Sequence, residues 1–248
     1  MPTVRLENVT KFFKFERKKH MAVQDINLTI EQGEFVFLNG SSGAGKSTVL
    51  RLLCGEISPD RGTAYLDNTN ISHLFGPWQI RLRRTFGVVW QEPRLIRKMN
   101  IYNNLLQTAR AGGLRSKSPR AVAKALALVG MQHVEQCYPA ELTLSDIRHV
   151  ELARALVCSP PILLLDELTA NLDDDSIWDI FHLLMELNNK GITIVMITHA
   201  SRYVNIMRKR VITLVDGQLI GDIHNGRYAQ TTASQPKIIF KTSAGSRK

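Results

Sequence analysis

A glycine-rich segment between a predicted strand and a predicted helix carries the strongest chemical signal in the sequence. Residues 40–47 read Gly-Ser-Ser-Gly-Ala-Gly-Lys-Ser, which fits the phosphate-loop pattern G-x-x-x-x-G-K-[ST]. Glycines let backbone N–H groups curl around phosphate oxygens, Lys46 can reach the β- and γ-phosphates, and Ser47 can ligate Mg²⁺. A flexible glycine loop without function would not need the lysine, the hydroxyl and both flanking elements together. The segment therefore predicts nucleotide binding, by Gly40, Ser41, Ser42, Gly43, Ala44, Gly45, Lys46, Ser47 and Thr48.

A second chemical signal is the acidic pair that follows the apolar run at 162–165. A buried strand that ends in two acids places Asp166 near a bound Mg²⁺ and Glu167 near the γ-phosphate, where it can orient water. Such a pair is often only a helix-start signal. Its position after a phosphate loop in the same chain favours ATP hydrolysis.

Apolar patterns predict the elements that hold these residues. We expect strands at 3–9, 23–30, 34–38, 87–90, 162–165 and 192–197, and helices at 47–54 and around 177–187. From about 91 to 158 the pattern is helical, with Ser118 and Pro119 as a cap and first-turn pair. The face of that helix is formed by Val122, Ala125, Leu126 and Val129. Alternating strands and helices in the second half predict βαβ units and a parallel sheet.

Composition sets the limits of this interpretation. The 248 residues, 44% of them hydrophobic, suit one large α/β domain with an inserted subdomain. No apolar run approaches the roughly 18 to 20 residues that span a bilayer, no secretory signal is evident, and three widely spaced cysteines suggest a reducing, cytoplasmic compartment. The net charge of +10 allows an anionic partner. We favour a membrane surface over nucleic acid, because no nucleic-acid-binding motif accompanies the basic clusters.

Further motifs occur in an order that resembles ABC ATPases over about residues 3–228. They are Gln91 after a strand, the segment Ala-Asn-Leu-Asp at 170–173, and His199 after residues 192–198. The resemblance implies an α/β fold: a P-loop NTPase (RecA-like) core with a parallel sheet, an N-terminal antiparallel β-subdomain and an inserted α-helical subdomain. It implies one domain at 1–228, with its core at 1–91 and 159–228 and the helical subdomain at about 92–158, followed by a flexible basic tail at 229–248.

The same resemblance assigns roles to single residues. Glu167, His199 and Gln91 are expected to be catalytic, with Gln91 sensing Mg²⁺ and the membrane partner. The expected metal ligands are Ser47, Gln91 and Asp166. Asp173 is expected to close a loop across a dimer. Phe13 resembles the aromatic residue that stacks on adenine, with Phe12 as an alternative, although a core or surface phenylalanine is nearly as well supported.

Within this class, residues 82–91 and 100–105 and the ending at 216–228 are similar to the cell-division ATPase family FtsE. The ATPases of lipoprotein-releasing and macrolide-type exporters are near relatives. The resemblance implies a dimer of ATPase subunits that binds ATP and Mg²⁺. It implies an FtsX-like transmembrane subunit as partner and a peripheral location at the cytoplasmic face of the bacterial inner membrane.

One segment departs from the family pattern. The L-S-G-G-[EQ] signature aligns with residues 142–146, Leu-Thr-Leu-Ser-Asp, so both glycines are missing. Thr143 keeps a hydroxyl at the serine position, and with Ser145 it is the expected contact to nucleotide. Leu144 adds bulk where a backbone amide should approach phosphate, which predicts slow turnover or an ATP-gated switch unless an intact paralogue is the partner.

Two further positions near this segment bear on the site. Arg148 and His149 either supply compensating charge to phosphate or form a basic solvent-exposed face. Leu168 replaces a proline that usually follows the catalytic glutamate.

Overall fold

The computed structural model describes residues 2–15, 18–74, 82, 84–224 and 226. The predicted tail at 229–248 lies outside the described residues, as does the end of the segment at 216–228. Two segments rich in lysine and arginine that contribute to the net charge, 14–20 and 81–84, are described only in part. Among the described residues no helix is long and apolar enough to cross a membrane.

The central sheet has the order β10-β9-β3-β8-β7-β6. Its strands are β3 (Phe35–Asn39), β6 (Phe86–Val89), β7 (Ile162–Asp166), β8 (Thr193–Ile197), β9 (Arg210–Val215) and β10 (Gln218–Ile223). All pairings among β6, β7, β8, β3 and β9 are parallel, and β10 pairs antiparallel with β9. Every residue of β3, β7 and β8 is buried, as expected for parallel strands covered on both faces. The predicted parallel sheet is confirmed.

A second, antiparallel sheet has the order β2-β1-β4-β5. It contains β1 (Val4–Phe15), β2 (Lys18–Ile30), β4 (Arg61–Leu66) and β5 (Thr69–Asn70). The antiparallel N-terminal sheet agrees with the predicted fold class. Strands β1 and β2 are longer than the predicted 3–9 and 23–30, because their backbones stay paired out to Phe15 and Lys18. The apolar pattern ends earlier, since side chains near the tip of this hairpin are exposed.

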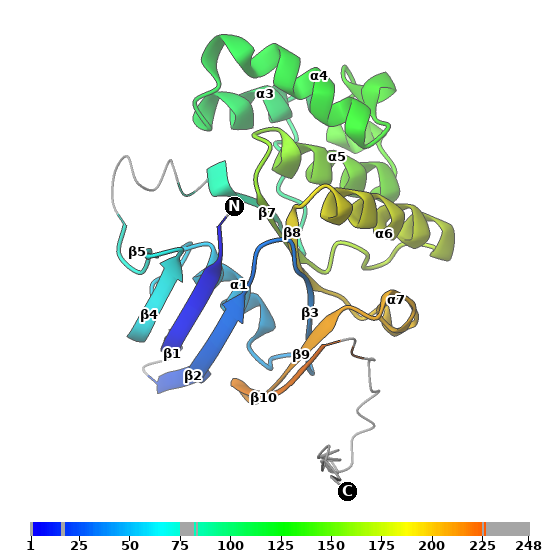
Figure 1. Cartoon of the computed structure of the whole chain (residues 1–248). Helices are drawn as coiled ribbons and strands as arrows, with labels where there is room; N and C mark the ends of the chain where they lie inside the picture. Colours follow the sequence, from blue (N-terminus) through cyan, green and yellow to red (C-terminus); the bar gives the residue numbers. More distant parts are fainter. Residues whose placement is uncertain (1, 16–17, 75–81, 83, 225, 227–248) are drawn as a thin grey trace, which may run out of the picture.

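The helices lie around the central sheet (Figure 1). Between β6 and β7 the chain forms α3 (Ile101–Ala111), α4 (Ser118–Leu128) and α5 (Leu144–Leu156), which gather at one end of the molecule. The others are α1 (Lys46–Leu53), α6 (Asp174–Asn189) and α7 (Ser201–Met207). Helix α1 lies next to the antiparallel sheet and α6 next to α5. The helical insertion between two strands of the sheet agrees with the predicted fold class.

The predicted cap at Ser118 is wrong. A 3-10 turn, η1 (Arg115–Lys117), runs directly into α4, so Lys117 precedes the helix with helical dihedral angles and Ser118 is its first residue. The hydroxyl of Ser118 is buried and has no hydrogen-bond partner among the described residues. The predicted apolar face is confirmed, since Val122, Ala125, Leu126 and Val129 are all buried.

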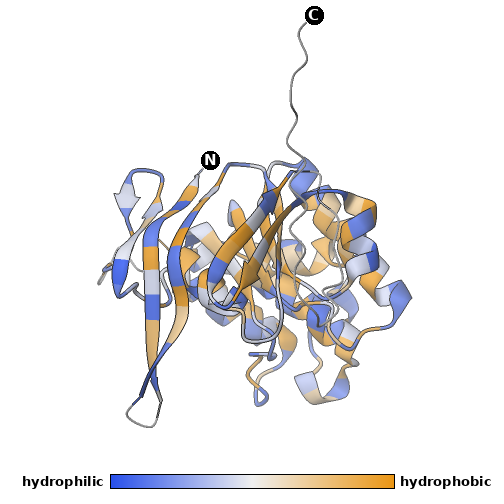
Figure 2. Cartoon of the chain, turned by 90° about the horizontal axis from the view of Figure 1, so that it is seen from below, coloured by the Kyte–Doolittle hydropathy of each residue, from blue (hydrophilic) through white to orange (hydrophobic). Residues whose placement is uncertain are grey.

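Alternating residues of the central strands pack into two cores. Phe35 and Phe37 of β3 face α3, α4, α5 and α6, while Val36 and Leu38 face α1 and the antiparallel sheet. Figure 2 shows mostly hydrophobic strands at the centre and helices of mixed character around them. The two cores pack against opposite faces of the central sheet and so fix the carboxyl-terminal ends of its strands. The residues predicted to be catalytic follow these strand ends.

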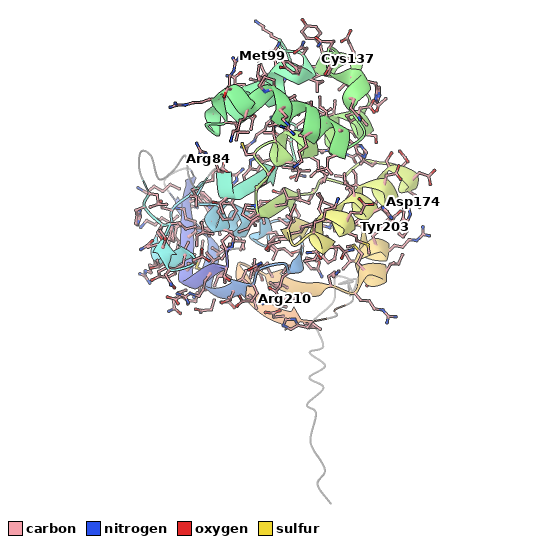
Figure 3. All side chains as sticks on the ribbon, turned by 45° about the horizontal axis from the view of Figure 1, so that its top comes forward. Arg84, Met99, Cys137, Asp174, Tyr203 and Arg210 are labelled. Atoms are coloured by element: carbon pink, nitrogen blue, oxygen red, sulfur yellow. The ribbon has the colours of Figure 1, made fainter. Side chains whose placement is uncertain are left out.

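Arg210 joins the two sheets on the side of the molecule away from α3 and α4 (Figure 3). Its Nε and Nη2 donate to the two carboxylate oxygens of Asp222 at 2.7 and 2.6 Å. Its Nη1 donates to the carboxylate of Glu34 at 2.8 Å and to the carbonyl of Thr29 in β2 at 2.9 Å. The hydrogen bonds from Arg210 hold the pKa of Asp222 below its ordinary value. One side chain thus ties β9 to β10 and to the end of β2.

We expect Arg210→Leu to lower the free energy of unfolding at pH 7 by about 2 kcal/mol, between the values for exposed and for fully buried ion pairs. Because the folded pKa of Asp222 is depressed, its contribution is complete above the unfolded pKa and is lost as the pH falls through the folded pKa. The difference between the two proteins should therefore shrink below about pH 4. Urea denaturation across this pH range measures it.

Arg202→Leu is the control, since Arg202 pairs with Asp174 at an exposed site. Its cost should stay within about 0.5 kcal/mol. Equal stability of Arg210→Leu and the unaltered protein at pH 7 would contradict the assignment.

Candidate nucleotide site

The loop between β3 and α1 is built on glycines that no other residue could replace. Gly40 has φ +147°, and a Cβ there would lie 2.4 Å from the carbonyl oxygen of Leu214. Gly45 has φ +97°, and a Cβ there would lie 2.6 Å from the carbonyl oxygen of Ala22. The loop is thus enclosed between β9 and β2. All the predicted phosphate-loop residues, from Gly40 to Thr48, lie in this loop and the first turn of α1.

Lys46 is the charged centre of the loop. Its side chain is buried, and its ammonium donates to the carbonyl oxygens of Gly40 and Ser41, both at 2.8 Å. Burial lowers the pKa of Lys46, while the nearby carboxylates of Glu167 and Asp166 act in the opposite direction. The geometry places a cation where the loop could surround a phosphate group.

Asp166, the last residue of β7, lies buried next to this loop. Its side chain is hydrogen-bonded to Ser47, and burial raises its pKa above the ordinary value. Its Oδ1 atom has no hydrogen-bond partner among the described residues. A buried carboxylate oxygen without a partner, beside a serine hydroxyl, fits a Mg²⁺ ion that also binds phosphate oxygens.

Glu167 is held by the other two residues predicted to be catalytic. The side-chain amide of Gln91 donates to Glu167 Oε2 at 2.9 Å, and His199 Nε2 lies 3.1 Å from Glu167 Oε1. The backbone of Glu167 has φ +51° and its N–H donates to the carbonyl of Ile197 at 3.0 Å. The ends of β6, β7 and β8 therefore bring Gln91, Glu167 and His199 into one cluster beside Lys46.

Two threonines that sequence reasoning missed support this cluster. Thr169 and Thr198 are buried, and their hydroxyl oxygens lie 2.9 Å apart. Thr198 also accepts a hydrogen bond from the N–H of Ala200 at 3.1 Å. This pair joins the loop that carries Glu167 to the loop that carries His199. The sequence offered one signal for this pair, because Thr198 directly follows the predicted buried strand at 192–197.

The remaining predicted contacts lie on other parts of the chain. Phe13 is 40% exposed on β1 and is paired with His20 of β2, two residues before the segment that packs on Gly45. Its exposure is compatible with stacking on a base, which stays a prediction. Asp173 caps α6 by accepting from the N–H and the hydroxyl of Ser176 at 2.9 and 2.8 Å.

The segment at the signature position forms a closed helix cap. Thr143 Oγ1 accepts from the N–H of Asp146 at 3.2 Å and donates to Asp146 Oδ2 at 2.7 Å, so the carboxylate sits at the first turn of α5. Leu144 is 37% exposed and Ser145 is half-buried. The hydrogen bonds of Thr143 and Ser145 are local to the start of α5 and include no residue of the cluster around Lys46 and Glu167, so their contact with nucleotide stays a prediction.

Both alternatives for Arg148 are wrong. Its side chain is buried, and its guanidinium donates to the carbonyl of Gln91 at 2.8 Å, facing the interior instead of phosphate or solvent. His149 is half-buried, with Nδ1 2.9 Å from the carbonyl of Ser145. Leu168, at the usual proline position, is fully buried.

Comparisons with known proteins agree with this geometry. The family model described as ABC transporter matches residues 23–170. The cell division ATP-binding protein FtsE of Mycobacterium tuberculosis is 37% identical over 91% of this chain and 97% of its own length, and FtsE of Streptococcus pneumoniae is 36% identical over 84% and 90%. The methionine import ATP-binding protein MetN 2 of Rhodococcus jostii is 37% identical over 88% of this chain and 65% of its own length. Among solved structures, the dimeric ATP-binding cassette MJ0796 bound to ADP and phosphate superposes with a TM-score of 0.80 at 30% identity, covering 91% of this chain and 100% of that one.

We expect Lys46→Ala to weaken ATP binding by roughly 10- to 100-fold, because a hydrogen bond from a charged group contributes about 1.5–3 kcal/mol. The thermal midpoint should stay close to that of the unaltered protein, since the variant removes a cation that burial disfavours. Titration with a fluorescent ATP analogue measures the affinity. Lys190→Ala, at an exposed position, is the control. Equal affinities for the two variants would rule out this role of Lys46.

Proposed function

The chain belongs to the ABC transporter ATP-binding family and is an ATPase, and from this premise we propose that it is the ATP-binding subunit of an FtsEX-like complex in cell division. The similarity to two FtsE proteins over most of their length supports the assignment to this branch. The observation that carries the hydrolytic role is the cluster in which Gln91 and His199 hold the carboxylate of Glu167 beside Lys46.

In this proposal each residue of the site has a separate role in ATP hydrolysis. The loop at 40–48 binds the phosphates, with Lys46 exchanging the carbonyls of Gly40 and Ser41 for phosphate oxygens. Ser47, Asp166 and Gln91 hold Mg²⁺, which when bound neutralises charge on the phosphates. Glu167 orients the attacking water and receives its proton, and His199 contacts the γ-phosphate.

The proposal extends to the organisation of the chain. Residues 1–228 form the ATPase domain, with its core at 1–91 and 159–228 and the helical subdomain at about 92–158. Two ATPase subunits bind ATP between them, which agrees with the dimeric state named for the structural relative MJ0796. Phe13 contacts the adenine of one site, and Thr143 and Ser145 contact the nucleotide held by the other subunit.

The membrane partner is an FtsX-like transmembrane subunit, and the chain lies peripherally at the cytoplasmic face of the inner membrane. A surface hollow of about 620 Å³ on the helical insertion supports a docking site there. Lys98, seven residues after Gln91 in the sequence, and Met99 both line the hollow. Figure 3 shows Met99 at the helical end of the molecule. The other lining residues of the hollow are Asn100, Asn103, Leu106, Gln107, Arg110, Ala111 and Tyr138.

A second candidate function is an ATP-gated switch with little turnover. The closed cap of Thr143 and Asp146 favours it, since a carboxylate occupies the helix end that would have to approach phosphate. An exporter of the lipoprotein or macrolide type is a further alternative within the same family. The ATPase-driven complex and the ATP-gated switch differ in what the membrane partner responds to. In the first it responds to hydrolysis, and in the second only to closure of the dimer.

The first experiment compares Mg-ATP turnover of the purified protein, alone and with its co-purified membrane subunit, with turnover of Glu167→Gln. We expect Glu167→Gln to lower turnover by about 100-fold or more while ATP still binds, because the general base is lost. ATP binding with no glutamate-dependent turnover in either setting would reject the ATPase-driven complex and select the switch.

A second experiment restores the missing glycines through Leu144→Gly with Ser145→Gly. We expect turnover to rise by at least about tenfold, since one backbone donor at a developing charge contributes about 10²–10³ in rate. The glycines should also destabilise α5 by roughly 1–2 kcal/mol. Leu128→Gly, at the end of α4, is a matched glycine control. Unchanged or slower turnover in the double variant would show that this segment does not limit hydrolysis.

A further inference from the structure

Three charged residues of α5 form a buried cluster next to the segment that carries Gln91. The side chains of Arg148, Glu151 and Arg154 are 4%, 0% and 16% exposed. Glu151 is paired with Arg148 Nη1 at 3.1 Å and with Arg154 Nη2 at 3.5 Å. We call these three residues the α5 charge cluster.

The α5 charge cluster binds the backbone of residues 90–94. Arg148 Nη2 donates to the carbonyl of Gln91 at 2.8 Å, and Nη1 reaches the carbonyl of Trp90 at 3.4 Å. Glu151 Oε1 accepts from the N–H of Arg94 at 2.9 Å, and Arg154 donates to the carbonyl of Arg94. Each member of the cluster therefore contacts the segment directly or through a partner.

Burying these charged groups opposes folding, so stability alone does not account for the α5 charge cluster. Burial raises the pKa of Glu151 and lowers that of Arg154, so desolvation opposes the charged forms of both. Buried ion pairs contribute little net stability compared with apolar residues of similar size, and their best-attested use is to fix one arrangement among several. What this cluster fixes is the path of the chain through Gln91.

The course of residues 90–94 determines where the side chain of Gln91 lies relative to Glu167. The side chain of Gln91, whose backbone carbonyl Arg148 holds, donates to the carboxylate of Glu167 at 2.9 Å. The centroid of the Trp90 ring lies 5.4 Å from the guanidinium of Arg51 in α1 and 4.9 Å from that of Arg94. The segment thus contacts both α5 and the phosphate-loop helix α1.

We propose that Arg148 is a positioning residue for Gln91, and that the α5 charge cluster makes α5 and residues 90–94 move as one body. The inference rests on the proposed hydrolytic roles of Gln91 and Glu167. Thr143, at the start of α5, lies five residues before Arg148, about 7.5 Å along the helix axis. A displacement of α5 when its first turn meets a partner's nucleotide would then displace Gln91 relative to Glu167.

The first test measures turnover in a double-mutant cycle of Arg148→Leu and Gln91→Ala. We expect Arg148→Leu to lower kcat by about tenfold or more, as for partners that orient a metal ligand, with KM for ATP changed less than about twofold. In the Gln91→Ala background it should cause no further loss, because the residue it positions is already gone. Arg148→Lys should recover part of the rate, since lysine can reach one carbonyl but lacks the planar fork.

Arg210→Leu is the matched control, because it removes another arginine that holds two carboxylates and a backbone carbonyl, far from Gln91. It should lower stability without lowering kcat. Multiplicative losses in the double-mutant cycle, or an equal loss of kcat in Arg210→Leu, would overturn the proposal.

A second test does not depend on turnover. With Trp78→Phe and Trp178→Phe, Trp90 is the single tryptophan of the chain and reports on the segment. In the nucleotide-free protein we expect Arg148→Leu to shift its emission to longer wavelength and to increase its quenching by acrylamide, and Arg210→Leu to change neither. Unaltered Trp90 emission and quenching in Arg148→Leu would overturn the proposal even if the chain hydrolyses ATP. If no variant or parent hydrolyses ATP, the proposed function fails and the Trp90 result alone decides the positioning role.

Discussion

The turn from β3 into α1 is the constraint on which the rest of the structure depends. Gly40 and Gly45 adopt dihedral angles and close contacts that exclude any side chain, and those contacts come from β9 and β2. The loop can therefore take its shape only when both sheets are in place. This explains why the eight consecutive residues of the phosphate-loop pattern, 40–47, need strands from both ends of the chain.

Much of this arrangement could be predicted because parallel strands end at a common edge. Once residues 34–38, 87–90, 162–165 and 192–197 are recognised as strands of one sheet, the residues that follow them must meet. Gln91, Glu167 and His199 follow three such strands, and the hydrogen bonds of Glu167 place all three side chains together. The meeting of these residues was thus accessible from the strand pattern, whereas the roles of Gln91 and His199 came from the resemblance to ABC ATPases.

Three features of the structure could not be predicted from the sequence pattern. Arg148 was expected either to supply charge to phosphate or to form a basic solvent-exposed face, whereas the structure buries it against residues 90–94. The extent of the β1–β2 hairpin was missed because backbone pairing, which leaves no apolar pattern, extends it. Ser118 failed as a cap because a 3-10 turn before it has no distinct sequence signature. Of these three, only the contacts of Arg148 join parts of the chain that are distant in sequence.

The carbonyl oxygens that hold Lys46 have a consequence for how tightly a phosphate group can be bound. The ammonium of Lys46 is buried and donates to the carbonyl oxygens of Gly40 and Ser41. Arrival of a phosphate group then exchanges one set of acceptors for another, without first stripping solvent from a free cation or ordering a loose loop. Preorganisation of this kind reduces the entropy lost on association, so more of the contact energy appears as affinity. The hydrogen bonds of Lys46 to the backbone of Gly40 and Ser41 thus hold the loop in one shape, and a phosphate group would replace those two acceptors.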